Sequence, residues 1–161
     1  MLKKDIFLGS ESILYQDETW GRDNMRACYP LQAESMMNKE IYNAGSFSGK
    51  AGILKYFCYE VYLKALEGQF FNPDQAALNI LAHTKWFDNC AFLKQEHGYS
   101  VQCGTVKDPE KVKYYKNFLL EGSPILQDDL VQYKNIILMI VHQYNRVPQF
   151  NGFLRHKYSF I

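Results

Sequence analysis

The sequence predicts an α/β fold in which a mixed sheet is flanked by helices. Short apolar segments that are typical of strands alternate along the chain with longer segments of helical periodicity, and this alternation indicates the class. The chain has 161 residues, of which 47% are hydrophobic and 22% are charged, as in ordinary soluble globular proteins. Because this length fits one domain better than two, we expect residues 1–161 to form a single domain.

Two strands are expected in the first third of the chain. Residues 5–9 form a short apolar segment that predicts a strand, and residues 41–49 are strand-like and bounded by glycine. Between them, residues 17–40 carry weak helical signals, which we expect Gly21 and Pro30 to interrupt.

A helix is expected directly after Gly49, ending at Gly68. A second helix is expected to begin at Asn72-Pro73-Asp74-Gln75, where Asn72 is the predicted cap and Gln75 stands at the capping-box position. Apolar side chains recur with helical spacing in both segments, at Ile53, Leu54, Phe57, Cys58, Val61, Ala65 and Leu66 and then at Ala77, Ile80, Leu81 and Thr84.

The second half of the chain continues the alternation. Short strands are expected near residues 91–95 and 100–103, followed by a helix that opens at Asp108-Pro109-Glu110 and runs through Leu120. Residues 136–141 form a continuous apolar run that is typical of a strand buried on both faces. A terminal helix is expected over residues 148–158.

Charge and cysteine usage exclude several classes of protein. The net charge of +1 gives no electrostatic reason to expect nucleic acid or an anionic membrane as the main partner. The four cysteines show no metal or redox spacing, so we expect buried, reduced thiols and a cytoplasmic location, with the inner face of a membrane as an alternative. The longest apolar run is too short to span a bilayer. Aromatic residues make up 16% of the chain, and exposed ones offer flat surfaces to sugars.

Three polar segments are candidates for a functional site. Ligands of open α/β sheets bind beyond the carboxyl ends of strands, and two segments are expected there: the turn Asn43-Ala44-Gly45 and the polar run His142-Gln143-Tyr144-Asn145-Arg146. The third is Asp74-Gln75, in the first turn of a helix. Each also has a structural interpretation, as a tight turn, as a core histidine and as a helix cap with its dipole charge, respectively.

The order of these segments resembles the acceptor half of a GT-A-type glycosyltransferase. An Asn-Ala-Gly turn at residue 43, a long helix, an Asp-Gln helix start at residue 74 and a terminal His-Gln-Tyr-Asn-Arg at residue 142 follow one another. The pattern is similar to glycogenin-like and lipopolysaccharide-galactosyltransferase-like enzymes, and closer still to uncharacterised bacterial sugar transferases. The resemblance covers about residues 41–158.

The resemblance implies a role for each matched position. Asn43, Ala44 and Gly45 would line the donor sugar, Asp74 would contact sugar hydroxyls, and Gln75 would lie near the anomeric carbon. His142 would complete a site for Mn²⁺ or Mg²⁺, and Arg146 would meet a phosphate or hold the terminal helix. The implied reaction transfers a sugar from a nucleotide sugar to a glycan or lipid-linked acceptor.

One element of such enzymes has no counterpart in this sequence. The metal and the diphosphate are normally held by an Asp-x-Asp segment in a donor-binding half, and no Asp-x-Asp occurs among the 161 residues. The sequence is therefore expected to represent the C-terminal part of a GT-A fold, complete only with that half. The alternatives are a non-catalytic module that binds carbohydrate or a partner, and a structural domain with accidental matches.

Overall fold

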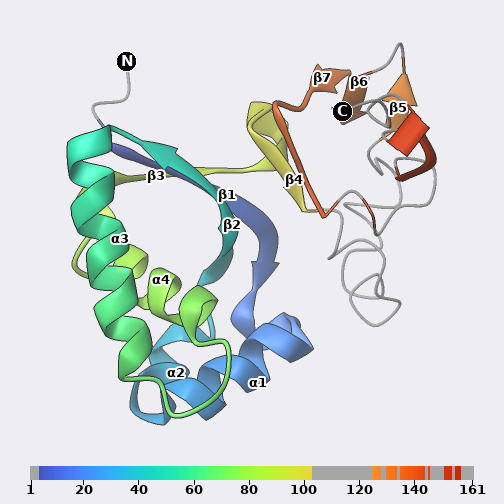
Figure 1. The fold of residues 1–161 in the computed structure, drawn as a ribbon. Coiled ribbons are helices and arrows are strands. Elements are labelled where there is room, and N and C mark those ends of the chain that lie inside the picture. Colours follow the sequence, from blue (N-terminus) through green and yellow to red (C-terminus); the bar gives the residue numbers. More distant parts are fainter. Residues whose placement is uncertain are drawn as a thin grey trace. The chain divides into compact units, whose positions relative to one another are not determined.

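A computed structural model describes residues 4–102, 125–127, 130–133, 135–143, 145, 151–153 and 155–156. They belong to two compact units, residues 1–93 and 94–161, and each unit is described by itself. Figure 1 shows their helices and strands, which confirm the α/β class and the mixed sheet. That residues 1–161 act as one domain stays a prediction.

The first unit is built on a three-stranded mixed sheet in the order β2-β1-β3. Strand β1 (Ile6–Leu14) pairs antiparallel with β2 (Glu40–Gly49) and parallel with β3 (Cys90–Leu93). Between β1 and β2 lie the short η1 (Tyr15–Asp17) and the helices α1 (Thr19–Cys28) and α2 (Pro30–Met36). Between β2 and β3 lie α3 (Ala51–Leu66), α4 (Asp74–His83) and η2 (Phe87–Asn89).

The core of this unit joins the sheet to α3 and α4. Phe57 of α3 and Leu78 of α4 are fully buried against the sheet. Trp86, just after α4, meets the Phe57 ring edge-on at 5.5 Å between ring centres. Fully burying side chains of this size stabilises the fold by about 1.5–3 kcal/mol each. The packing therefore holds α4 firmly against β2.

The ladder between β1 and β2 is interrupted twice. Leu8 pairs with Phe47, Ser10 with Tyr42 and Leu14 with Glu40, so residues 43–46 bulge from β2 and residues 11–13 from β1. The expectation that Asn43-Ala44-Gly45 forms a turn beyond a strand is therefore wrong, because these residues lie inside β2. The bulge nevertheless frees them from regular pairing.

Helix α1 includes Gly21 instead of breaking there, which corrects the expected interruption. The carboxylate of Glu18 caps the helix, accepting from the Trp20 N–H at 3.1 Å and from the Gly21 N–H. A Cβ atom on residue 21 would lie 2.7 Å from Glu18 Oε2 and 2.9 Å from Ile41 Cδ1. Glycine is needed at this position because the cap and the sheet approach so closely.

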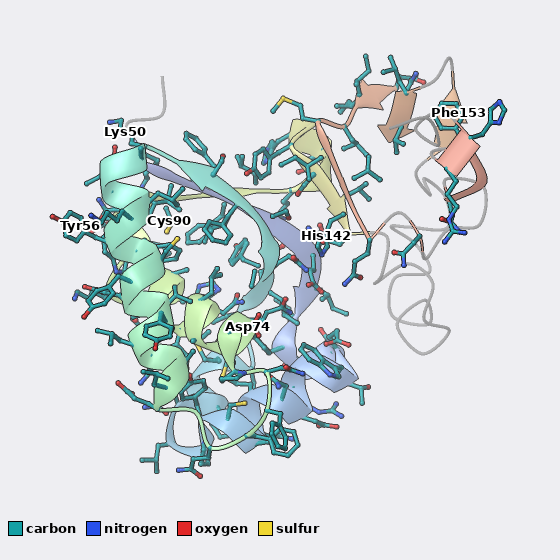
Figure 2. All side chains as sticks on the ribbon, in the orientation of Figure 1. Lys50, Tyr56, Asp74, Cys90, His142 and Phe153 are labelled. Carbon is teal, nitrogen blue, oxygen red and sulfur yellow. The ribbon has the colours of Figure 1, made fainter. Side chains whose placement is uncertain are left out.

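Helix α3 has the expected extent, but its burial is narrower than the apolar pattern predicts. Phe57 is buried, whereas Cys58 and Leu66 are exposed, which corrects two of the expected inward positions. Three tyrosines on the outward side, Tyr56, Tyr59 and Tyr62, are also largely exposed. Figure 2 shows Tyr56 pointing away from the unit. Within the described ranges no helix is long and apolar enough to cross a bilayer.

Helix α4 begins without the expected capping box. Its first residue is Asp74, its cap position is Pro73, and no side chain caps it. Asn72 has a left-handed backbone with φ 57°, so it lacks the extended conformation of a capping residue. The side chain of Gln75 is engaged elsewhere, on β1.

The second unit contains two small sheets among its described residues. Parallel β4 (Ser100–Gln102) and β8 (Ile140–His142) form one. Antiparallel β5 (Ile125–Gln127), β6 (Leu130–Tyr133) and β7 (Ile136–Ile137) form the other, and η3 (Gln95–His97) precedes β4. The strands expected near residues 91–95 and 100–103 are confirmed as β3 and β4.

The apolar run at residues 136–141 is not one strand buried on both faces, which corrects that prediction. Its first residues pair with β6, and the Leu138 N–H still donates to Val131 O of that strand at 3.0 Å. Its last residues pair with β4, and the Met139 N–H donates to Gly98 O, just before β4, at 3.1 Å. Met139 is 75% exposed. Residues 151–153 and 155–156 are helical, within the expected terminal helix, whereas Cys103 and the helix expected over residues 108–120 lie outside the described residues.

Candidate functional site

A polar stripe on α4 runs along the outer edge of β2. Asn79 is fully buried, and its side-chain amide pairs with both backbone groups of Tyr42: Oδ1 accepts from the N–H at 2.8 Å, and Nδ2 donates to the carbonyl at 2.7 Å. One turn later, His83 Nε2 donates to the Glu40 carbonyl at 2.9 Å. Four helical residues rise about 6 Å and two strand residues span about 6.6 Å, so the two spacings match.

The same stripe begins at Gln75, which reaches a buried carboxylate. Gln75 Nε2 donates to Glu11 Oε1 at 3.3 Å, and Asn43 Nδ2 donates to the same oxygen at 2.8 Å. Glu11 is 5% exposed. Asn43 on β2 and Gln75 on α4, both in the candidate segments of the sequence, therefore meet on a carboxylate that lies outside those segments.

The bulge in β2 shapes the surroundings of Asn43. Asn43 Oδ1 accepts from the Gly45 N–H at 2.6 Å, so the side chain closes a local turn within the strand. Asn43 is buried, Ala44 is half-buried and Gly45 is exposed. The three residues therefore lead from the protein surface to the Glu11 carboxylate.

The opposite bulge in β1 carries Glu11 itself. Ser12 has a left-handed backbone with φ 57°, which is uncommon for a residue other than glycine. Its N–H donates to Ser10 Oγ at 2.7 Å, and Ser10 is fully buried. The distortion is held by hydrogen bonding within the strand, and strained backbone of this kind concentrates at functional sites.

Helix α1 holds the start of α4 in place. Asn24 Nδ2 donates to the Asn72 carbonyl at 3.2 Å and to the Phe71 carbonyl at 3.4 Å. The buried Cys28 thiol lies 3.9 Å from the Phe70 carbonyl. These contacts fix the segment from which Asp74 emerges, and Asp74 is exposed at the start of α4 (Figure 2).

A buried phenol lies beside this cluster. Tyr15 is 1% exposed, and its hydroxyl has no hydrogen-bond partner among the described residues. Burial raises the pKa of Tyr15 well above its usual value, and the negative charges of Glu11 and Glu18 raise it further. The phenol therefore keeps its proton throughout the neutral range.

The cluster has the composition of a site for a hydroxyl-bearing ligand. The carboxylate accepts hydrogen bonds, the amides of Asn43 and Gln75 both donate and accept, and the phenol donates. Hydrogen bonds from hydroxyl groups to an ionised carboxylate are about twice as strong as bonds between neutral groups. Sugars present several hydroxyls, each of which can donate and accept hydrogen bonds.

His142 belongs to the second unit, where it is the last residue of β8. It lies opposite Gln102 in the parallel pair, and burial lowers its pKa. Asn145 is exposed, whereas Arg146 and Tyr144 lie outside the described residues. That His142 shares a site with Gly45 stays a prediction.

The described residues do not fit the expected divalent metal. In the part of the chain that the structure describes, no three His, Cys, Asp or Glu side chains gather closely enough to hold an ion. Mn²⁺ and Mg²⁺ prefer several oxygen ligands, which a single imidazole at His142 does not supply. No step of the chemistry is therefore assigned to a metal.

Comparison with known proteins gives no relative. No protein-family model, curated protein or solved structure matches the chain.

Proposed function

We propose that the chain is a glycosyltransferase-type protein of the GT-A class whose sugar-binding groups surround Glu11. One observation carries the proposal: Asn43, which the resemblance places along the donor sugar, and Gln75, which it places near the anomeric carbon, donate to the same oxygen of the Glu11 carboxylate. The mixed α/β sheet is compatible with this class. The ligands are a nucleotide sugar and a glycan or lipid-linked acceptor.

In this proposal the chain binds and orients the sugar. The Glu11 carboxylate accepts from one or two sugar hydroxyls, and Asn43 fixes the carboxylate through its 2.8 Å bond. Asp74, exposed at the start of α4, accepts from a further hydroxyl. Gln75 presents an amide between them, next to the reacting carbon. Holding the reactants in one geometry is a large part of catalysis in bimolecular transfer.

The test is binding of nucleotide sugars to the chain, with an isosteric change at the central carboxylate. UDP-glucose, UDP-galactose, UDP-N-acetylglucosamine and GDP-mannose are titrated into protein labelled with ¹⁵N and followed by NMR. Glu11→Gln keeps the shape but removes the charge, and we expect binding to weaken about 10- to 100-fold, as for hydrogen bonds to charged groups.

The matched control is Glu40→Gln. Glu40 is a half-buried carboxylate on the same strand pair, and its Oε2 accepts from the Tyr42 hydroxyl at 3.0 Å. This variant should bind sugars as the wild type does. An equal loss in both variants, or no binding of any sugar to the wild type, would contradict the proposal.

The second candidate is a binding module without transfer activity. Two observations favour it: no Asp-x-Asp occurs in the sequence, and the outward side of α3 exposes Tyr56, Tyr59 and Tyr62, which could contact a glycan or a protein. A donor-hydrolysis assay with the same sugars and Mn²⁺ tests the second candidate. Because no Asp-x-Asp is present, we expect this chain alone to bind without releasing nucleotide under either candidate, and release above background would exclude the module.

A further inference from the structure

The buried hydroxyl of Tyr15 differs from those of two other buried tyrosines, Tyr29 and Tyr42. The Tyr29 hydroxyl donates to the Lys64 carbonyl at 2.7 Å, and the Tyr42 hydroxyl donates to Glu40 Oε2 at 3.0 Å. The Tyr15 hydroxyl is buried without a partner among the described residues. Because an unpaired buried hydroxyl costs free energy, a phenylalanine would be the more stable choice at this position.

Two carboxylates act on the Tyr15 phenol. One of them, Glu18, is occupied by the α1 cap, where it accepts from two backbone N–H groups. The other is Glu11, the acceptor shared by Asn43 and Gln75. A hydroxyl of a ligand can accept one hydrogen bond and donate another at the same time. Such a group between Tyr15 and Glu11 would satisfy the phenol and keep the carboxylate paired.

We propose that Tyr15 binds the ligand directly, by donating to a sugar hydroxyl that itself donates to the Glu11 carboxylate. This inference rests on the proposed function and names one specific contact within it. Because the phenol remains protonated next to the carboxylate, it acts as a donor at neutral pH. The pair therefore selects a hydroxyl group over a ketone, an ether or an amine.

The hydrogen bond from Gln75 to Glu11 is the contact that a ligand can replace. Its bond to Glu11 Oε1, at 3.3 Å, is the longer of the two amide contacts, and its side chain is half-buried. A bond of this length is beyond the usual range for N–H···O contacts and is easily exchanged. In the bound state a sugar hydroxyl replaces the Gln75 amide on the carboxylate, while Asn43 stays in place.

A second unpaired hydroxyl lies on the same bulge. Ser12 Oγ is buried and has no partner among the described residues, and Ser12 also carries the left-handed backbone. The two unpaired hydroxyls, of Ser12 and Tyr15, both follow Glu11 within four residues of the chain. This arrangement favours a ligand with several hydroxyls over a single bound water.

The first experiment measures stability. Tyr15→Phe should leave the melting temperature unchanged or raise it, because no hydrogen bond is lost. Tyr29→Phe is the matched control, and it should lower the melting temperature by about 2–8 °C, since it removes one buried bond. An equal decrease in Tyr15→Phe would mean that a permanent partner, such as a bound water, satisfies the phenol, and would overturn the inference.

The second experiment measures binding of the four nucleotide sugars named above. Tyr15→Phe should weaken the binding of whichever sugar the wild type binds by about tenfold, while Tyr29→Phe should leave it unchanged. With ¹³C-labelled tyrosine, the Cζ resonance of Tyr15 should move on addition of that sugar. A purely structural tyrosine would not respond in this way.

The outcomes separate the inference from the proposed function. If the wild type binds a sugar and Tyr15→Phe binds it equally well, the inference is wrong and the proposed function stands. If Glu11→Gln binds as the wild type does while Tyr15→Phe loses binding, the phenol acts without its carboxylate, and the bridging contact is wrong. If the wild type binds none of the sugars, both proposals fail.

Discussion

Replacing Asn79 by alanine should strongly destabilise the first unit. The side chain is fully buried and pairs with the N–H and the carbonyl of Tyr42 at 2.8 and 2.7 Å. Alanine has no polar atom, so both backbone groups would remain buried without these partners. The helix itself would gain, because alanine has the higher helix propensity.

The expected loss follows from the two unpaired groups. Each buried backbone group left without a partner costs about 1–3 kcal/mol, which gives about 2–6 kcal/mol for Asn79→Ala. The gain in helix propensity returns less than about 0.7 kcal/mol. A net loss of about 1.3–5.3 kcal/mol is large against the 5–15 kcal/mol that is typical of whole domains, ~0.05–0.15 kcal/mol per residue.

Urea denaturation followed by circular dichroism measures this loss directly. Asn38→Ala, an exposed asparagine just before β2, is the control and should change the free energy of unfolding by less than about 0.5 kcal/mol. Asn79→Asp retains an acceptor for the Tyr42 N–H but lacks the two N–H groups of the side-chain amide, one of which donates to the Tyr42 carbonyl. This variant should also be strongly destabilised. A loss below about 1 kcal/mol for Asn79→Ala would refute the reasoning, since Tyr42 would then have found other partners.

Three further predictions concern other elements. Asp74→Asn should cost only about 0.3–1 kcal/mol in stability, because the exposed charge stabilises only the helix start. The same variant should bind sugars more weakly than the wild type. Equal binding in an NMR titration would mean that Asp74 serves the helix alone. Gly21→Ala should lower the free energy of unfolding by about 1 kcal/mol despite its helical position, because the new Cβ displaces the Glu18 cap; a higher melting temperature would contradict this. Burial lowers the pKa of His83 from its ordinary value of 6.5, so the unfolded chain binds the proton more tightly. Stability should therefore fall as the pH drops below about 6.5 towards the lower native pKa, and His83→Gln should reduce that dependence in melts from pH 8 to pH 5.

The helices and strands that depend on local pattern were predicted well from the sequence. The apolar periodicity before Gly68 placed α3, and the short apolar segments at residues 5–9 and 91–95 placed parts of β1 and β3. These signals depend only on residues close in the chain. The capping box at Asn72 failed for the opposite reason, since Asn24 and Glu11, both distant in sequence, decide the conformation of Asn72 and Gln75.

The candidate site was predicted only in part. Asn43 and Gln75 were identified through the resemblance to GT-A-type enzymes. Glu11 and Tyr15 were not identified, because the sequence around each is typical of an ordinary strand or loop. One signal was present: residues 75, 79 and 83 are polar at four-residue intervals in an otherwise apolar helix. Such a stripe in a buried helix must find polar partners, and here Asn79 and His83 pair with the edge of β2 while Gln75 pairs with Glu11 of β1.

The pairing of α4 with β2 also sets an order of events during synthesis. Strands β1 and β2 lie ahead of α4 in the chain, so the outer edge of β2 emerges from the ribosome before the helix that covers it. At about 5–20 residues per second, the interval from Gly49 to His83 lasts about 2–7 s. Through that interval the Tyr42 backbone can pair with a strand of another nascent chain. Arrival of Asn79 ends this exposure, so the residue that stabilises the finished fold also limits the time available for misassembly.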